Sequence, residues 1–192
     1  MIRRALFALS LLALGACRDD IAALPEPVEM TAEAVGHYCQ MNLLEHPGPK
    51  AQVHLSGLPN PLFFSQVRDA IAYQRMPEQS HAITVIYVSD MGYGANWDDP
   101  GARNWIPAAT ALYVVGADIA GGMGAPELVP FSTRAEAEAF ALAHGGDILS
   151  LDAIPDALVL TPVEIDGDTG TGTDDDTDFE QRLRALSRQM EG

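Results

Sequence analysis

Two ten-residue stretches, FSQVRDAIAY at 64–73 and FSTRAEAEAF at 131–140, match one another at an offset of 67 residues. Both begin with Phe-Ser and end on an aromatic residue, and two alanines and one acidic position coincide. Each stretch predicts the end of a strand, a serine N-cap (Ser65 or Ser132) and an amphipathic helix. The match therefore indicates that the chain contains two copies of one structural unit.

Strands are predicted on both sides of each helix. In the first copy they lie at roughly 36–43 and 52–55 before the helix and at 83–88 after it. In the second copy they lie at 110–115 and 128–131 before the helix and at 147–151 after it, and Gly145-Gly146 ends the helix. Since the elements do not alternate strictly as βαβ, we predict an α+β fold of two tandem ββαβ units with antiparallel sheet, at 35–95 and 105–160.

The first 17 residues have the pattern of a secretory signal. Arg3 and Arg4 precede an apolar run at 5–16, which is too short to cross a bilayer comfortably. The motif LGAC at 14–17 resembles a bacterial lipobox, which implies that residues 1–16 are removed and that Cys17 is acylated. An ordinary signal peptide cleaved nearby is the alternative. The lipobox implies a stable, periplasm-facing lipid anchor, and Arg18 in place of Asp after the cysteine favours the outer membrane.

Both ends of the mature chain differ in composition from its centre. Segment 17–34 contains Pro25 and Pro27, and we predict that it tethers the domain to the membrane. Segment 161–192 is rich in glycine, threonine and acidic residues, which predicts an acidic linker. A short terminal helix is expected after it, because four apolar residues follow at helical spacing: Phe179, Leu183, Leu186 and Met190.

Charge and cysteine content exclude several functions. The chain of 192 residues carries a net charge of −16 and a single lysine, Lys50, which argues against nucleic-acid partners and against a basic membrane-binding patch. Loss of residues 1–16 would leave 9 cationic against 27 acidic residues, a net charge of −18. Two cysteines do not make a disulfide scaffold. If Cys17 carries lipid, Cys39 is the one free thiol.

The stretch HYCQM at 37–41 contains three candidate metal ligands. On an extended chain His37, Cys39 and Met41 would project from one face. Thiolate and thioether sulfur favour Cu(I), and imidazole also suits copper, whereas zinc would require further Cys or His ligands at suitable spacing. The alternative is a small buried cysteine beside a methionine that only fills the core.

A further candidate ligand is Met123, which glycines flank on both sides in GGMG at 121–124. Met91 lies in a similar setting after a strand and ranks below Met123. Four other histidines are expected to be superficial or structural: His46, His54, His81 and His144. Cys39 with His37 could also form a nucleophile and base, but no orienting third group or oxyanion donors are evident. We therefore predict a binding protein and not an enzyme.

Taken in order along the chain, these motifs resemble the NosL family, copper-binding lipoproteins that serve nitrous oxide reductase. The set comprises the lipobox at 14–17, Cys39-x-Met41, Met123-Gly124, VPFS at 129–132 and AHGGDIL at 143–149. The resemblance implies a fold of two ββαβ units and delivery of Cu(I) to the reductase in the periplasm.

The resemblance also implies ligand roles for Cys39, Met41 and Met123, and His37 is kept as a possible ligand from the alternation argument. In relatives the methionine at the position of Met123 usually follows proline, so with Gly122 there we expect a looser loop. Two alternatives stay open. One is an envelope lipoprotein that acts as a scaffold without metal, and the other is a thiol-dependent envelope enzyme that uses Cys39.

Overall fold

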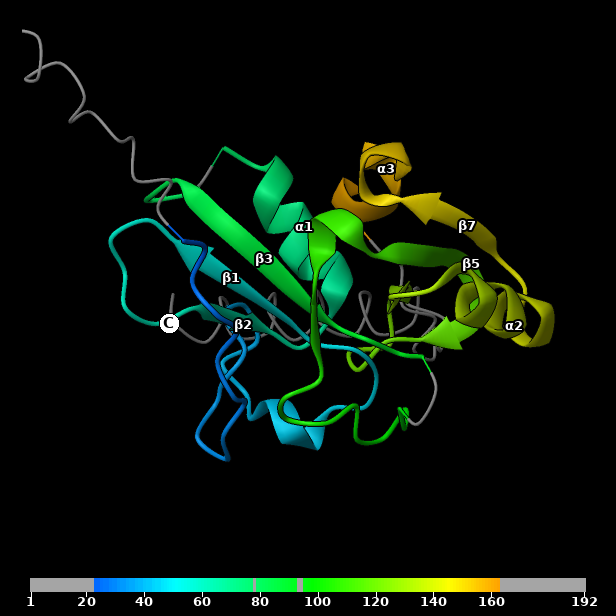
Figure 1. The fold of residues 1–192 in the computed structure, drawn as a ribbon, viewed down its shortest axis with the longest axis horizontal. Helices are drawn as coiled ribbons and strands as arrows, with labels where there is room; N and C mark the ends of the chain where they lie inside the picture. Colours follow the sequence, from blue (N-terminus) through cyan, green and yellow to red (C-terminus); the bar gives the residue numbers. More distant parts are fainter. Residues whose placement is uncertain (1–22, 78, 93–94, 163–192) are drawn as a thin grey trace, which may run out of the picture.

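The computed structural model describes residues 23–77, 79–92 and 95–162. Its elements are, in order, η2 (Leu43–Glu45), β1 (Ala51–Leu55), β2 (Leu62–Phe64), α1 (Val67–Arg75), β3 (Ile83–Ser89), β4 (Trp105–Pro107), η3 (Ala108–Thr110), β5 (Leu112–Ala120), β6 (Pro126–Phe131), α2 (Arg134–His144), β7 (Asp147–Ser150), η4 (Leu151–Ala153) and α3 (Asp156–Leu160). One ββαβ unit is β1, β2, α1 and β3, and the other is β5, β6, α2 and β7 (Figure 1). The predicted α+β class and tandem repeat are confirmed.

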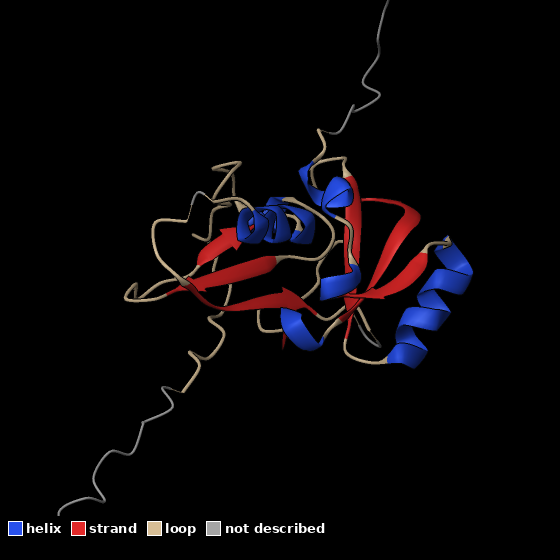
Figure 2. Cartoon of the chain, turned by 90° about the horizontal axis from the view of Figure 1, so that it is seen from above, coloured by secondary structure: helices blue, strands red, loops and turns tan. Residues whose placement is uncertain are grey.

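The two sheets have the same internal arrangement. Their strand orders are β2-β1-β3-β4 and β6-β5-β7, and every pair is antiparallel. In each unit the first strand lies between the second strand and the strand that follows the helix. Val53 of β1, for example, lies opposite Leu62 on one side and Ile86 on the other, and Val114 of β5 lies opposite Val129 and Ile148 in the second sheet. The strands of the two sheets run in different directions (Figure 2).

The two units share one hydrophobic core. Helix α1 lies between the two sheets, and α2 lies on the outer side of the second sheet (Figure 1). Alternate residues of β1 face the shared core, and alternate residues of β5 and β6 join it from the second unit: Ala51, Val53, Leu55, Tyr113, Val115 and Leu128. The intervening residues Val114 and Val129 pack with Ala137 of α2 in a second core. This period-two pattern explains why the apolar runs of the second unit are buried on both faces.

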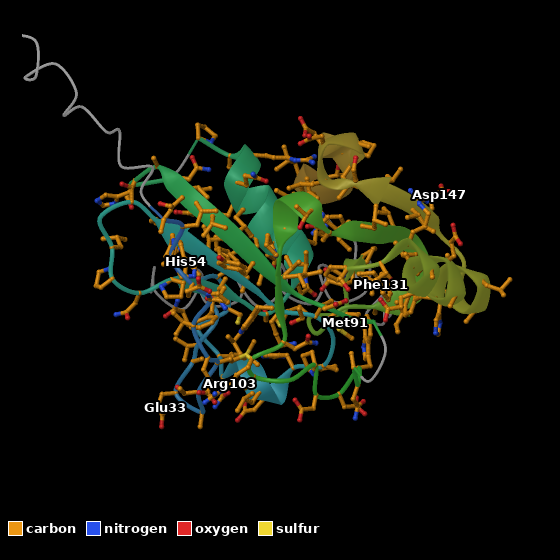
Figure 3. The ribbon with its side chains drawn as sticks, viewed as in Figure 1. Glu33, His54, Met91, Arg103, Phe131 and Asp147 are labelled. Carbon is orange, nitrogen blue, oxygen red and sulfur yellow. The ribbon has the colours of Figure 1, made fainter. Side chains whose placement is uncertain are left out.

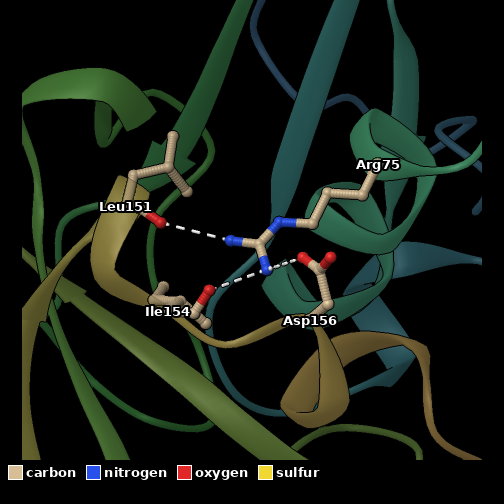
Figure 4. A network of polar contacts seen from close by, with 4 residues as sticks. All are labelled: Arg75, Leu151, Ile154 and Asp156. Carbon is tan, nitrogen blue, oxygen red and sulfur yellow. Dashed lines mark hydrogen bonds and ion pairs between the residues drawn. The ribbon is translucent and has the colours of Figure 1, made fainter.

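Arg75, the last residue of α1, joins the first unit to the end of the second. Its guanidinium donates from Nη1 to the Ile154 carbonyl and the Asp156 carboxylate, each at 2.8 Å, and from Nη2 to the Leu151 carbonyl at 3.2 Å (Figure 4). A single planar side chain thus satisfies two carbonyl groups around η4 and the first turn of α3.

The segment before the first unit packs against the body. The Gln52 side chain exchanges two hydrogen bonds with the Val28 backbone, at 2.8 and 3.0 Å, and the Tyr87 hydroxyl donates to the Pro25 carbonyl. Met30 is buried. The predicted tether is therefore wrong for residues 25–34, where Pro25 and Val28 bond to the first sheet and Met30 is buried. Residues 17–22 of that tether, and the predicted terminal helix in 163–192, lie outside the described residues.

The helix ends differ from the predicted ones by one residue. Gln66, and not Ser65, is the N-cap of α1, and its side chain makes no capping bond. In α2 the N-cap is Thr133, whose hydroxyl accepts the Glu136 N–H, and Ser132 lies before it. The predicted glycine C-cap is confirmed at Gly145, which has a φ of 71°. None of the helices within 23–162 that the structure describes is long and apolar enough to cross a membrane.

Candidate metal centre

Residues 35–42 form a tight loop, so the predicted strand at 36–43 is wrong. Val35 and Asn42 pair in an antiparallel bridge, and Gly36 donates its N–H to the Met41 carbonyl at 3.0 Å. Gln40 has a φ of 56°, and its side chain donates to the Gly36 and His37 carbonyls. These local bonds replace a strand ladder, because a polar side chain can satisfy nearby backbone groups. The candidate ligands of 37–41 therefore do not project from one strand face.

His37 stands against an aromatic cluster. Its N–H donates to the Phe63 carbonyl at 2.6 Å, and Gly36 pairs with Phe63 in a parallel bridge. The imidazole lies edge-on to Phe64 and Tyr73, with ring centroids 5.6 Å away in both cases. These contacts fix the ring of His37 at the side of α1 where β2 ends.

Cys39 is a half-buried free thiol that points at the segment between β2 and α1. Its Sγ donates to the Ser65 hydroxyl oxygen at 3.7 Å. A Cβ atom added at Gly36 would stand 2.4 Å from this sulfur, so glycine at position 36 leaves the space that the thiol occupies. Met41, two residues further along the loop, is 40 % exposed. One sulfur is thus held against the protein, and the other is accessible to solvent.

Met123 lies in the turn between β5 and β6, which docks tightly on the first unit. The Met123 N–H donates to the Gln66 side-chain oxygen at 2.8 Å, and the Met123 side chain is half-buried. A Cβ atom at Gly122 would stand 2.6 Å from the Pro47 carbonyl oxygen and 2.9 Å from the His46 Cβ. The expectation of a looser loop at Gly122 is therefore wrong: the glycine permits close packing that a larger residue would prevent.

Ser65 and Gln66 bring the two sulfur-bearing loops together. Ser65 accepts the thiol of Cys39, and Gln66 accepts the N–H of Met123. Because these two residues are adjacent, their Cα atoms are about 3.8 Å apart. The loop at 35–42 and the turn at 121–124, far apart in sequence, thus both contact the segment at the N-terminal end of α1.

Sequence reasoning missed Ser65, Gln66 and His46 as parts of this region. His46 directly follows η2, and its Nδ1 lies 3.2 Å from the Gly122 carbonyl oxygen. A serine before a helix predicts an N-cap, and nothing in the sequence indicates that the Ser65 hydroxyl instead receives a thiol.

The remaining candidates lie elsewhere. Met91 packs beside Phe131 in the second core, and its N–H donates to the Pro130 carbonyl (Figure 3). His54 contacts the Gln52 side chain on β1, and His144 lies 3.2 Å from the Asp118 carboxylate at the end of α2. Both fit the predicted structural roles. No group of three or more His, Cys, Asp or Glu side chains that could hold a metal gathers within the described ranges.

A buried carboxyl group lies beneath the turn that carries Met123. Glu127 accepts backbone N–H groups of Arg68 and Leu128 through Oε1, at 3.0 and 2.9 Å. Burial raises the pKa of Glu127 to about 8, despite those hydrogen bonds. Burial likewise lowers the pKa of Lys50 to about 8, and its ammonium group donates to the Pro47 and Gly48 carbonyls. This region therefore holds Glu127 in its neutral form near neutral pH.

Replacement of Glu127 by glutamine should flatten the fall of stability between mildly acidic and neutral pH. The folded chain keeps the Glu127 proton up to a pKa of about 8, whereas the ordinary pKa of a Glu side chain is 4.5. This proton therefore stabilises the fold at low pH, and its contribution is lost as pH rises towards 8. Lys50 changes its contribution only above pH 8, where stability recovers as pH rises.

Urea unfolding at about pH 5 and about pH 7.5 measures this effect, and the pH-dependent difference between wild type and Glu127→Gln should be on the order of 3 kcal/mol. Glutamine keeps an acceptor oxygen for the two backbone N–H groups, so the fold should persist. Parallel pH profiles of the two proteins would contradict a raised pKa at Glu127.

The fold and the site define a class: a small protein of two ββαβ units that presents a cysteine and methionines on two loops at the N-terminal end of its first helix. The family model of NosL matches residues 27–159, which is more than half of the chain. The chain belongs to the NosL family.

Named relatives agree with this assignment. The copper-binding lipoprotein NosL of Achromobacter cycloclastes is 59 % identical over 195 residues, which cover 100 % of this chain and 98 % of that protein. The protein of the same name from Stutzerimonas stutzeri is 32 % identical over 143 residues, covering 74 % and 73 % of the two chains. The crystal structure of the copper chaperone NosL from Shewanella denitrificans superposes with a TM-score of 0.64 at 30 % identity, covering 69 % of this chain and 98 % of that one.

Proposed function

We propose that this chain is a membrane-anchored, periplasmic Cu(I) metallochaperone that holds copper through Cys39, Met41 and Met123. The observation that carries the proposal is that two sulfur-bearing loops contact the adjacent residues Ser65 and Gln66. A thiolate and thioethers are the soft ligands that Cu(I) prefers. The relatives named as copper-binding lipoproteins and as a copper chaperone support the same metal.

Exposure of the ligands suits transfer and not permanent storage. Cys39 is half-buried, whereas Met41 is 40 % exposed and borders solvent. A partner could therefore replace the accessible thioether first, while the thiolate keeps the ion. In this proposal the protein carries copper and has no catalytic role of its own.

The anchor and the recipient complete the proposal. Cys17 would carry the lipid, with the outer membrane favoured over the inner, and the relatives named as lipoproteins support an envelope location. The recipient would be nitrous oxide reductase, as the family resemblance implies. Residues 1–22 lie outside the described residues, so the anchor is tested directly by mass spectrometry of the protein purified from membranes.

Anaerobic titration of the soluble domain with Cu(I), in competition with a chromophoric chelator, tests the central claim. We expect one tightly bound copper ion per chain. If the chelator keeps all the copper, the metallochaperone proposal fails. A scaffold without metal would then be favoured, and thiol alkylation kinetics would test the enzyme alternative, because a catalytic Cys39 should react fast.

His37, kept as a possible ligand in the sequence analysis, is left out of the proposed ligand set because its ring packs edge-on against Phe64 and Tyr73, and this choice has its own test. We expect His37→Phe to bind copper within about threefold of wild type, because Phe preserves the edge-on contacts with Phe64 and Tyr73. Competition titration measures the affinity, and circular dichroism checks the fold. A loss of more than about 100-fold with an intact fold, beyond what removal of a supporting group costs, would instead assign a ligand role to the His37 imidazole.

A further inference from the structure

Side chains of the first unit form hydrogen bonds to both polar atoms of the peptide group between Gly122 and Met123. Its carbonyl oxygen lies 3.2 Å from Nδ1 of His46, and its N–H donates to the side-chain oxygen of Gln66 at 2.8 Å. Hydrogen bonds to both polar atoms fix the plane of a peptide unit, which otherwise rotates through the adjacent φ and ψ angles. A fixed peptide plane also fixes the direction in which the Met123 side chain leaves the backbone.

Hydrogen-bond chemistry shows which ring nitrogen of His46 donates to the Gly122 carbonyl. A carbonyl oxygen only accepts, so Nδ1 must carry the proton that it donates to Gly122. Nε2 is buried and has no hydrogen-bond partner among the residues that the structure describes. Buried polar atoms rarely remain unpaired. Among the described residues, the polar contact that the His46 ring makes is thus the bond from Nδ1 to the turn of Met123.

Both residues that bind this peptide belong to segments close in sequence to Cys39 or to its partner Ser65. His46 ends the short helix that follows the loop of Cys39 and Met41, and its N–H donates to the Leu43 carbonyl. Gln66 follows Ser65, which accepts the Cys39 thiol. The position of Met123 is thereby tied to the segments that position Cys39, although 84 residues separate the two sulfurs in sequence.

Close packing of the turn at 121–124 further restricts the backbone of Met123. A Cβ atom at Gly121 would stand 2.7 Å from a Glu127 carboxylate oxygen and 3.0 Å from the Gln66 side-chain oxygen. With Gly122 against His46 and Pro47, the turn has no room to shift towards the first unit. A methionine has three rotatable bonds of its own, so a fixed backbone is what limits the volume that its sulfur explores.

We propose that His46 and Gln66 are positioning residues that clamp the Gly122–Met123 peptide and thereby hold the Met123 thioether within reach of a Cu(I) ion on Cys39. This inference rests on the proposed function and extends it to residues that do not touch the metal. Groups that orient a ligand commonly change metal affinity by about 10- to 100-fold when removed.

Three substitutions of His46 separate positioning from direct ligation. His46→Ala removes the bond to Gly122 and should weaken Cu(I) binding about tenfold in the chelator competition. His46→Asn places an amide N–H near the position of Nδ1 and should restore affinity to within about threefold of wild type, whereas His46→Gln places its nitrogen nearer the position of Nε2 and should not. X-ray absorption should find three sulfur neighbours of copper in wild type and His46→Asn, and two in His46→Ala. His81→Ala, an exposed histidine outside this region, is the matched control.

The same His46 variants can also give results that contradict the positioning role of His46. Rescue by His46→Gln and not by His46→Asn would make His46 a copper ligand through Nε2. Unchanged affinity and sulfur count in His46→Ala would show that the bond is not needed. In a Met123→Leu background, His46→Ala should add no further loss, and a full additional loss would mean that His46 acts through another group.

A copper-free readout keeps this test separate from that of the proposed function. In the apo protein, the Met123 ε-methyl NMR signal should sharpen and move towards its random-coil position in His46→Ala, and it should stay in place in His46→Asn. If wild type fails to bind Cu(I) but the methyl signal behaves in this way, the proposed function is wrong and the clamp stands. If the signal is the same in all three proteins, the clamp is wrong.

Discussion

Cys39→Ser should reduce the Cu(I) affinity of this chain by more than about 100-fold, beyond the range seen when only a supporting group is lost. Cys39 supplies the one thiolate of the proposed site, and a serine hydroxyl is a hard, neutral ligand that does not replace it. The fold should be retained, because the change keeps the shape of the side chain and the Ser65 hydroxyl can accept from an O–H as it does from the thiol.

Anaerobic competition with a chromophoric Cu(I) chelator measures the affinity of Cys39→Ser. Two methionine variants are measured in the same way for comparison. Met41→Leu should cost less than Cys39→Ser, since one thioether is removed and the thiolate remains. Met91→Leu should bind as wild type does, because Met91 packs with Phe131 in the second core. Copper binding by Cys39→Ser at wild-type strength would refute the assignment of Cys39, and a loss in Met91→Leu equal to that in Met41→Leu would refute the assignment of Met41.

Gly122→Ala should both destabilise the fold and weaken copper binding. The added Cβ atom would stand 2.6 Å from the Pro47 carbonyl oxygen, a backbone atom that cannot turn away, and 2.9 Å from the His46 Cβ. Overpacking of this kind typically costs about 1 to 3 kcal/mol. Because the turn must move away from His46 and Gln66, we also expect the affinity for Cu(I) to fall at least as far as in His46→Ala, by about tenfold or more.

Gly57→Ala is the control for the general effect of replacing a glycine. Gly57 has a φ of 79°, so alanine is strained there, but nothing lies within 4 Å of the added atom. Its cost should be about 1 to 2 kcal/mol with no change in copper affinity. Urea unfolding and chelator competition on both variants separate the two effects. Equal copper affinities in Gly122→Ala and Gly57→Ala would show that the turn at 121–124 has no part in the site.

The repeat at 64–73 and 131–140 was sufficient to predict the architecture, because local patterns determine helices and strands. Amphipathic spacing and a glycine C-cap act within one element, so the positions of α1, α2, β3 and β7 followed from the sequence. The strand predicted at 36–43 was wrong for a physical reason. Alternating side chains also suit a loop, and here the Gln40 side chain and the bridge from Val35 to Asn42 satisfy the backbone instead.

The tether was predicted too long for a related reason. Prolines and acidic residues at 25–34 are typical of a linker, but the bonds from Val28 to Gln52 and from Tyr87 to Pro25 join positions 24 and 62 residues apart. No local sequence pattern indicates such long-range hydrogen bonds. The same holds for Ser65, whose hydroxyl accepts a thiol from 26 residues away in place of the helix N–H groups that a serine N-cap would bind.

The sequence by itself determined the repeated ββαβ fold, the family, and the residue types able to bind a soft metal, because periodicity and ligand chemistry are properties of short segments. The tertiary structure alone decided which of those residues lie near one another in space. It separated Met91 from the candidate ligands by packing it in the second core. It brought Met123 to the segment that holds Cys39, through hydrogen bonds to Gln66 and His46 that span 57 and 76 residues. Contacts of that range follow from how two sheets pack around one helix, which no stretch of the chain encodes alone.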